Sequence, residues 1–243
     1  MTLRTLKSKI HRNFSDYGLV RGVSKSALYA LQPFYKKTAY RIYGLDVQAA
    51  NPFEPTDGQF VYRLLLDSDL DAIRQVESMA EWLEGKIAER IRTGSLCCAA
   101  MHGEQVVAFN LVSLNEVTIP LVELRWRFQP NEAWSEHIST HRDWRNLGLA
   151  TNVRHRVISA LKQQDIEWFF GGTIRDHAGT LKLASRVGFT ELGDIRYRRV
   201  FNYQNWSFEG ISSEHNRHVP QPFDGLGQFS ADQLPVQPPT HRT

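Results

Sequence analysis

Cysteine and long apolar runs are both scarce in this chain of 243 residues. Its two cysteines, Cys97 and Cys98, are neighbours, so they can build neither a disulfide framework nor a zinc site. No stretch of about 18 apolar residues occurs, which argues against a transmembrane helix, and the N-terminus lacks the apolar core of a signal peptide. We therefore expect a protein of the reducing cytoplasm that holds no metal.

The overall composition is that of a soluble globular protein, but its charge is unevenly distributed. Apolar residues make up 42% of the chain and charged residues 23%, values close to the average. Residues 1–50 carry nine Lys or Arg against two Asp, a net charge of +7, which leaves −4 for the remaining 193 residues. This asymmetry suggests a basic segment that is attracted to an anionic partner, with a solvated arm that has no partner as the alternative.

Three regions can be distinguished along the chain. Residues 1–50 are expected to form a basic helical extension, which ends at a turn-forming segment that contains Pro52, Pro55 and Gly58. Residues 58–206 have the patterning of a folded domain. Residues 207–243 contain five prolines among polar residues and are expected to form an irregular tail.

The central region reads as strands followed by alternating strands and helices. Residues 96–101 and 105–114 flank a hairpin signal, and residues 122–128 and 132–140 are expected to form a second pair. Helices are expected near 81–92, at 148–164 and at 178–187, with a short buried strand at 166–170 between the last two. This order predicts an α/β fold with a mixed, mostly antiparallel central sheet flanked by helices.

The segment Thr140–Thr151 carries the clearest chemical signal. It leaves a predicted strand and opens a predicted helix, and it contains the pattern Arg145-x-x-Gly148-x-Ala150. Small residues let the backbone approach a ligand, and the free N–H groups at a helix N-terminus attract an anion. With the added cation of Arg145, the loop is suited to a pyrophosphate.

This segment resembles the acyl-CoA-binding motif of the GNAT superfamily, and His177–Phe189 resembles the second motif of that family, a helix that closes in Gly-Phe. The resemblance covers roughly Gly58 to Tyr203. It implies the GNAT fold, acetyl-CoA or another acyl-CoA as the donor, and transfer to an amine of a small molecule or peptide by direct attack in a ternary complex. Residues implied to bind the donor are Ile138, Ser139 and Thr140 along the pantetheine arm, Arg145, Asn146, Leu147, Gly148, Leu149, Ala150 and Thr151 around the pyrophosphate, and His177 near the pantetheine.

The chain departs from the family pattern at both usual catalytic positions. Ala184 stands where a tyrosine acid is common, and Gly172 stands where the related protein-N-terminal acetyltransferases have a glutamate base. An amine must lose a proton before attack, so another base is needed. The candidates are Glu132 and Glu136, whose spacing along a strand puts both on one side of the sheet, with Glu123 as a third option.

Other roles remain open from the sequence. Tyr197, Ser185 or water are candidates for protonating the departing thiolate, and Trp126 and Trp134 are expected to face each other across the second strand pair, where they could line an acceptor pocket.

The alternative to an enzyme is a non-catalytic GNAT-like binding protein whose basic segment 1–50 docks on an anionic membrane, an acyl-carrier protein or nucleic acid. Nucleic acid is the least favoured of these partners, because no recognised nucleic-acid module is present. Docking on a membrane would place the protein at its cytoplasmic surface. Removal of residues 1–50 is expected to leave a folded core that still binds CoA. The alternative is that the segment packs against the core, so that its removal causes aggregation or loss of thermal stability.

Overall fold

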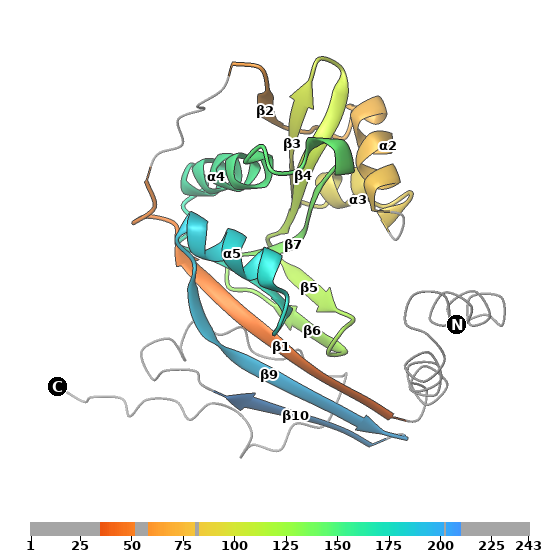
Figure 1. Cartoon of the computed structure of the whole chain (residues 1–243), viewed down its shortest axis with the longest axis vertical. Coiled ribbons are helices and arrows are strands. Elements are labelled where there is room, and N and C mark those ends of the chain that lie inside the picture. The colour runs from red at the N-terminus through yellow and green to blue at the C-terminus, as the bar shows by residue number, and fades with distance from the viewer. Residues whose placement is uncertain (1–34, 52–57, 81–82, 202, 210–243) are drawn as a thin grey trace.

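The computed structural model describes residues 35–51, 58–80, 83–201 and 203–209 (Figure 1). Its elements are β1 (Tyr35–Asp46), β2 (Val61–Leu64), α2 (Leu70–Met79), α3 (Ile87–Arg92), β3 (Leu96–His102), β4 (Gln105–Ser113), β5 (Glu116–Ile119), β6 (Leu124–Arg127), β7 (Glu132–Thr140), α4 (Leu149–Lys162), β8 (Trp168–Ile174), α5 (Ala178–Val187), β9 (Thr190–Val200) and β10 (Tyr203–Glu209), with a short 3-10 turn at Arg142–Trp144. Eight strands form one sheet in the order β10-β9-β1-β8-β7-β4-β3-β2. Its pairs are antiparallel except β7 with β8, which confirms the predicted mixed α/β fold.

The two faces of the sheet are covered by different elements (Figure 1). Helices α4 and α5 pack on one face, where Val153, Val157 and Leu161 of α4 are buried in the core. Helices α2 and α3 cover the other face near β3 and β4. The separate hairpin β5–β6 covers that second face further along the sheet, over β7, β8, β1 and β9. The helix boundaries expected at 148–164 and 178–187 agree closely with α4 and α5.

The expectation of a helical extension over residues 1–50 is wrong for residues 35–46. These form β1, which lies inside the sheet between β8 and β9, so that Tyr40 is opposite both Ile174 and Ile195. The segment mixes basic residues with aromatic and β-branched ones, a composition that suits a strand whose partners supply the burial. The boundary placed at residue 50 therefore cuts through the core. Residues 1–34 lie outside the described residues.

Three of the nine cations assigned to the basic segment are on β1, and two of these are already paired. Lys36 forms an ion pair with Glu123 at 3.1 Å. Arg41 pairs with Asp194 at 2.7 Å and with Glu191 at 2.8 Å. These side chains hold strands together, and they are not available as a docking surface for an anionic partner.

The predicted pairing of 122–128 with 132–140 is also wrong. Strand β6 pairs with β5, across a turn that includes Pro120, while β7 pairs with β4 and β8. Glu123, which has a φ of 52°, ties this turn to the main sheet because it accepts hydrogen bonds from Lys36, Arg199, Gln204 and the Tyr197 hydroxyl. Burial raises the pKa of Glu123, but these bonds outweigh it and hold that pKa below its ordinary value.

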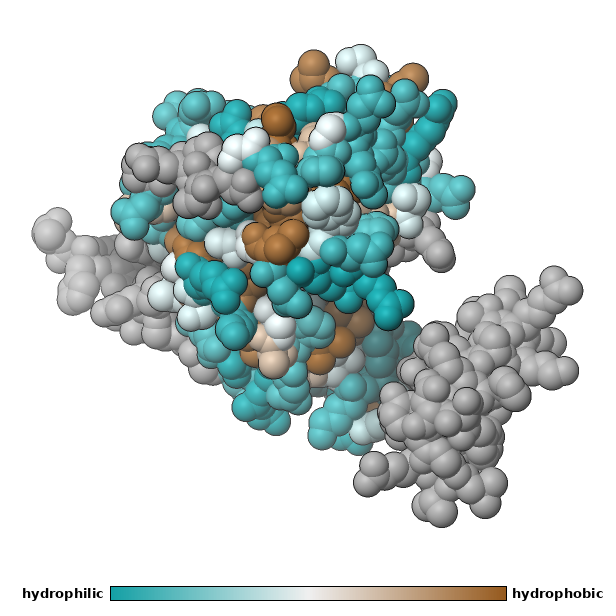
Figure 2. Space-filling model, turned by 45° about the horizontal axis from the view of Figure 1, so that its top comes forward, coloured by the Kyte–Doolittle hydropathy of each residue, from teal (hydrophilic) through white to brown (hydrophobic). Residues whose placement is uncertain are grey.

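The C-terminal edge of the sheet extends past the predicted boundary at 206. Strand β10 runs to Glu209 and pairs with β9, while residues 210–243 lie outside the described residues. On the face shown in Figure 2, apolar residues are scattered among hydrophilic ones and do not gather in one extended patch. No helix in the described part of the chain is both long and apolar enough to cross a membrane.

Candidate functional site

The parallel strands β7 and β8 separate part-way along their length. They pair only from Glu132 opposite Trp168 to Ser135 opposite Gly171, although β7 continues to Thr140 and β8 to Ile174. Beyond Ser135, β7 pairs with β4 on one side only, so its other backbone edge faces an open slot. The slot is about five residues long, or roughly 16 Å at the rise of a strand, which is enough to take an extended chain as an added strand.

A bulge in β7 marks the point where the slot begins. Ser135 is opposite Val112 of β4, whereas His137 is opposite Leu111, so Glu136 is the extra residue. The buried Asn110 stabilises the bulge, because its Nδ2 donates to the His137 carbonyl at 2.9 Å and to Ser135 Oγ at 3.0 Å.

The N-terminus of α4 lies at the open end of the slot and has the features of an anion site. Its N-cap residue is Gly148, whose φ of 76° places it in the left-handed region that favours glycine. No side chain caps this end and no acidic residue lies in the first turn. The first backbone N–H groups, on Leu149, Ala150 and Thr151, and the positive end of the helix dipole are therefore available to an anion.

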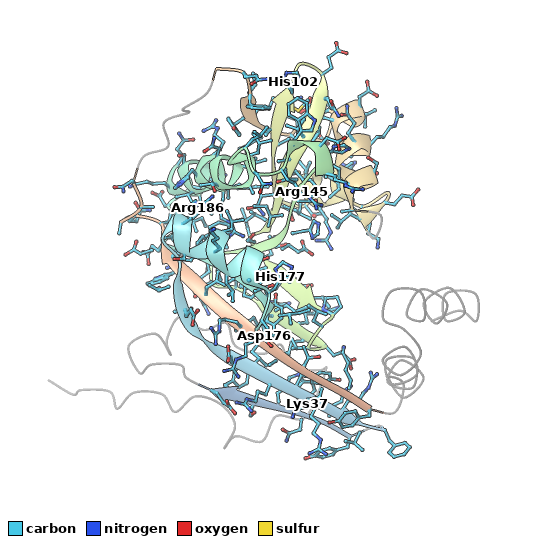
Figure 3. All side chains as sticks on the ribbon, viewed as in Figure 1. Lys37, His102, Arg145, Asp176, His177 and Arg186 are labelled. Carbon is cyan, nitrogen blue, oxygen red and sulfur yellow. The ribbon has the colours of Figure 1, made fainter. Side chains whose placement is uncertain are left out.

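A pocket of about 540 Å³ joins this helix end to the slot and to α5. It brings together ten of the eleven residues predicted to bind the donor, namely Ile138, Ser139, Thr140, Arg145, Asn146, Gly148, Leu149, Ala150, Thr151 and His177. The eleventh, Leu147, is exposed and does not line it. Lys182 and Arg186 on α5 add two cations, and the pocket lining contains no Asp or Glu. Figure 3 shows how Arg145, His177 and Arg186 are placed around the two helices.

The loops around the pocket are held by aromatic and capping contacts. Trp144 packs on His102 with ring centroids 4.6 Å apart and on Phe60 at 5.7 Å. His177 is the N-cap of α5, and its Nδ1 accepts the backbone N–H of Thr180 at 3.2 Å. This bond requires an unprotonated Nδ1, so a neutral His177 carries its proton on Nε2.

The two predicted bases lie on one side of the sheet, as their spacing indicated, but neither lines the pocket. Glu132 is buried at the start of β7, about 10 Å before the slot by strand rise, and accepts the Gln129 N–H at 3.0 Å. Burial raises its pKa. Glu136 is at the bulge, where its carboxylate pairs with Arg90 and accepts a hydrogen bond from Ser113 at 3.0 Å. Glu136 is therefore the nearer of the two, and its carboxylate is already neutralised.

The surroundings of Gly172, where the resemblance to the GNAT pattern would place a glutamate, leave no room for a side chain. A Cβ at Gly172 would overlap the ring of Tyr40, and one at Gly171 would overlap the ring of Tyr43, so β1 occupies the space that a β8 side chain would need. Tyr40 is 6% exposed, and its hydroxyl makes no hydrogen bond with the described residues. Burial raises its pKa far above the ordinary value. A protonated hydroxyl therefore lies beside the slot, on the face opposite α4 and α5.

His137, like Tyr40, is a residue that the sequence did not indicate as a candidate for handling protons. It follows the bulge, is half-buried and packs against Phe109 with ring centroids 5.5 Å apart. Burial lowers its pKa from the ordinary 6.5, although the nearby Glu136 acts in the opposite direction. The imidazole is therefore neutral at pH 7 and able to accept a proton. The bulge, which cannot be read from an isolated sequence, places the backbone of His137 beside the slot, but neither its side chain nor that of Tyr40 is among the residues that line the pocket.

The remaining candidates for handling protons lie elsewhere. Tyr197 donates its hydroxyl to Glu123 under the β5–β6 turn, and Ser185 is exposed on α5 outside the pocket. Trp126 and Trp134 do contact each other, with ring centroids 5.6 Å apart, but both are fully buried and form core rather than a pocket wall.

A larger hollow, of about 900 Å³, lies beside α2 and β2. Its lining mixes Arg63 and Arg74 with Asp69, Asp71 and Glu104, and Arg63 is paired with Asp69 at 2.7 Å. These three carboxylates disfavour a pyrophosphate there. The smaller pocket at α4 is therefore the candidate site for a nucleotide-containing ligand.

Comparison with known proteins gives a match at the level of fold. No protein-family profile matches the chain, and no curated protein sequence matches it. Among solved structures, a GCN5-related N-acetyltransferase from Sphaerobacter thermophilus aligns over 73% of this chain and 56% of its own, with a TM-score of 0.51 and 14% identity. A glucosamine N-acetyltransferase region of a fungal multi-domain β-N-acetylglucosaminidase aligns over 74% and 23%, with a TM-score of 0.50 and 14% identity.

A GNAT-family protein from Novosphingobium aromaticivorans aligns over 64% of this chain and 60% of its own, with a TM-score of 0.47 and 17% identity. The chain thus spans less than two thirds of the length of each of these three structures. The first two likenesses show that the described part of the chain has the GNAT fold.

Proposed function

We propose that this protein transfers an acyl group from an acyl-CoA to an amine acceptor. The observation that carries the proposal is the pocket at α4, in which an uncapped helix N-terminus, three cations and an unpaired strand edge converge without any carboxylate in the lining. A pyrophosphate needs the first two features, and the amides of a pantetheine arm need the third.

Each part of the pocket has a distinct role in holding the donor. The N–H groups of Leu149, Ala150 and Thr151 bind the pyrophosphate oxygens, and Arg145, Lys182 and Arg186 add cationic contacts. Residues 138–140 pair with the pantetheine amides as a neighbouring strand would. The thioester then lies at the bulge of β7, where the slot closes.

We assign the proton transfers to the two side chains next to the bulge. His137 accepts the amine proton as nitrogen attacks the thioester carbonyl, so that a C–N bond forms and the C–S bond breaks. The Tyr40 hydroxyl donates a hydrogen bond to the departing thiolate, and the proton that His137 has taken from the amine is then released to give the free thiol of CoA. Glu136 remains the alternative base, and its pairing with Arg90 makes it the weaker one.

Replacement of His137 by Gln is expected to lower kcat by about 100-fold or more while leaving CoA affinity unchanged. In the native protein, activity should be lost as the pH falls through the lowered pKa of His137, because protonation removes the base, and the variant should lose this acid limb. The same assays on Glu136→Gln and Glu132→Gln serve as matched controls. A full rate in His137→Gln together with a large loss in Glu136→Gln would transfer the role to Glu136.

The competing function is a binding protein that holds CoA without turnover, which the absence of the family's tyrosine and glutamate favours. Release of free thiol from acetyl-CoA in the presence of a panel of amines distinguishes the two. Acceptor-dependent release supports the enzyme. Saturable CoA binding without release with any amine would support the binding protein.

A further inference from the structure

Arg154 is a buried arginine without an acidic partner. It projects from α4 toward the sheet and is 1% exposed, yet none of the ion pairs among the described residues involves it. Its Nη2 donates to Ser135 Oγ at 3.1 Å, whereas its Nε and Nη1 have no hydrogen-bond partner. A buried guanidinium in this state is costly, because its charge and two of its donor atoms have lost water without replacement.

Arg154 does not itself line the candidate pocket, but its position on α4 places it next to residues that do. Ala150 and Thr151 line the pocket, and Arg154 is four and three residues further along α4, on the same side of the helix. Helical side chains lean toward the helix N-terminus, so Arg154 leans toward these two residues. Its partner Ser135 is the last residue of β7 that pairs with β8. The Nη2 end of the guanidinium is therefore at the closed end of the slot, next to the unbonded Nε and Nη1.

The surroundings of Arg154 orient it without neutralising it. Its guanidinium carbon lies 5.0 Å from the centre of the Phe189 ring and 5.8 Å from that of Tyr43. Ser135 Oγ accepts from both Arg154 and Asn110, which leaves its own hydroxyl proton free to donate. A carboxylate accepts two parallel bonds from one edge of an arginine, which here would be the second N–H of Nη2 together with the unbonded Nη1 or Nε, and the Ser135 hydroxyl would add a third donor.

From this arrangement we infer that the acyl group carried by the donor ends in a carboxylate, as in a succinyl or malonyl thioester, and that Arg154 and Ser135 bind that carboxylate. The inference rests on the proposed function, since it places the thioester in the slot between β7 and β8. It refines that function, because the protein would then transfer a dicarboxylic acyl group in preference to acetyl.

The test compares thioesters that differ at the far end of the acyl chain. Succinyl-CoA and butyryl-CoA both carry a four-carbon acyl chain, which ends in a carboxylate in the first and in a methyl group in the second. Acetyl-CoA and CoA give the baseline affinity of the pocket without a long acyl chain. Calorimetric titration of the full-length protein should show succinyl-CoA binding about tenfold to a hundredfold more tightly than butyryl-CoA, the effect expected of charge-assisted bonds to a buried carboxylate. This comparison needs no variant.

Two arginine variants on the same helix locate the preference. Arg154→Met should bring the two affinities within about threefold and leave acetyl-CoA affinity unchanged, because a methionine of similar length replaces an unpaired charge. It should also retain or raise the thermal midpoint, whereas loss of a purely structural arginine would lower it. The neighbouring half-buried Arg156, changed to Met, should keep the preference.

Equal or tighter binding of butyryl-CoA by the native protein would overturn the inference and leave the proposed function intact. A preference that survives in Arg154→Met would overturn the assignment to this residue. Failure of every thioester and of CoA to bind would overturn the proposed function, and this inference with it.

Discussion

A chain lacking residues 1–50 is expected to lose its cooperative thermal transition and near-UV circular dichroism signal. The deletion removes β1 from the middle of the sheet, between β8 and β9, together with the buried side chains Tyr40, Ile42, Tyr43, Leu45 and Val47. At roughly 1.5–3 kcal/mol for each large apolar side chain, the lost burial is comparable with the whole free energy of unfolding of a domain, about 5–15 kcal/mol.

The matched control is a chain that begins at residue 35, which keeps every described element. It should unfold cooperatively near the native midpoint and retain CoA binding. If the chain lacking residues 1–50 unfolds cooperatively and binds CoA with native affinity, β1 does not lie inside the sheet. That result would support the interpretation, drawn from the sequence, that residues 1–50 are an appendage.

Replacement of Gly148 by Glu should weaken CoA binding by at least about 100-fold in calorimetry. The new carboxylate would lie at the helix N-terminus, where it would repel the pyrophosphate and compete for the N–H groups of the first turn. The protein should stay folded, because a Cβ at this position meets no other atom within 4 Å.

Gly148→Ala provides the control for backbone strain. Alanine suffers the same cost of a φ of 76° without the charge or the bulk, so this variant should retain most of the CoA affinity. Loss of binding in Gly148→Ala equal to that in Gly148→Glu would show that the loop conformation, and not the anion site, was damaged.

Replacement of Arg145 by Ala should weaken CoA binding by about 1–3 kcal/mol, the range for one charge-assisted hydrogen bond.

The grouping of residues at the α4 pocket could be predicted from the sequence because its signals are local. The signals are a glycine before a helix, an arginine three residues earlier and a second helix whose N-cap is His177, and each lies within a few residues of the backbone feature that it creates. Ten of the predicted residues accordingly line one pocket. The exception is Leu147, whose orientation depends on the turn of the loop and not on its place in the motif.

The position of β1 could not be read in the same way, because its partners are far away in the chain. Tyr40 is opposite Ile174 and Ile195, more than 130 residues later, and no local periodicity reports such pairings. The same segment carries Lys36, Lys37 and Arg41, so composition favoured a basic arm. The available signal was the run of aromatic and β-branched residues from Thr38 to Tyr43.

The residues proposed to handle protons could not be inferred from the sequence for a related reason. The sequence pointed to carboxylates by residue type, but Glu132 and Glu136 are engaged by Gln129 and Arg90, respectively. The position of His137 depends on a one-residue bulge in β7, and that of Tyr40 next to Gly172 depends on the pairing of β1 with β8. Both depend on non-local register, which a single sequence does not contain.

The central claim is that acyl-CoA binds between α4, α5 and the free edge of β7, and hydrogen exchange measured with and without CoA tests it most directly. The backbone N–H groups of Leu149–Thr151 have no partner within the helix, and residues 138–140 have an unpaired edge toward β8. Saturating CoA should slow exchange at both segments in the native protein and at neither in Gly148→Glu. Unchanged exchange at both segments, or slowing confined to residues 68–75 beside the larger hollow, would contradict the account.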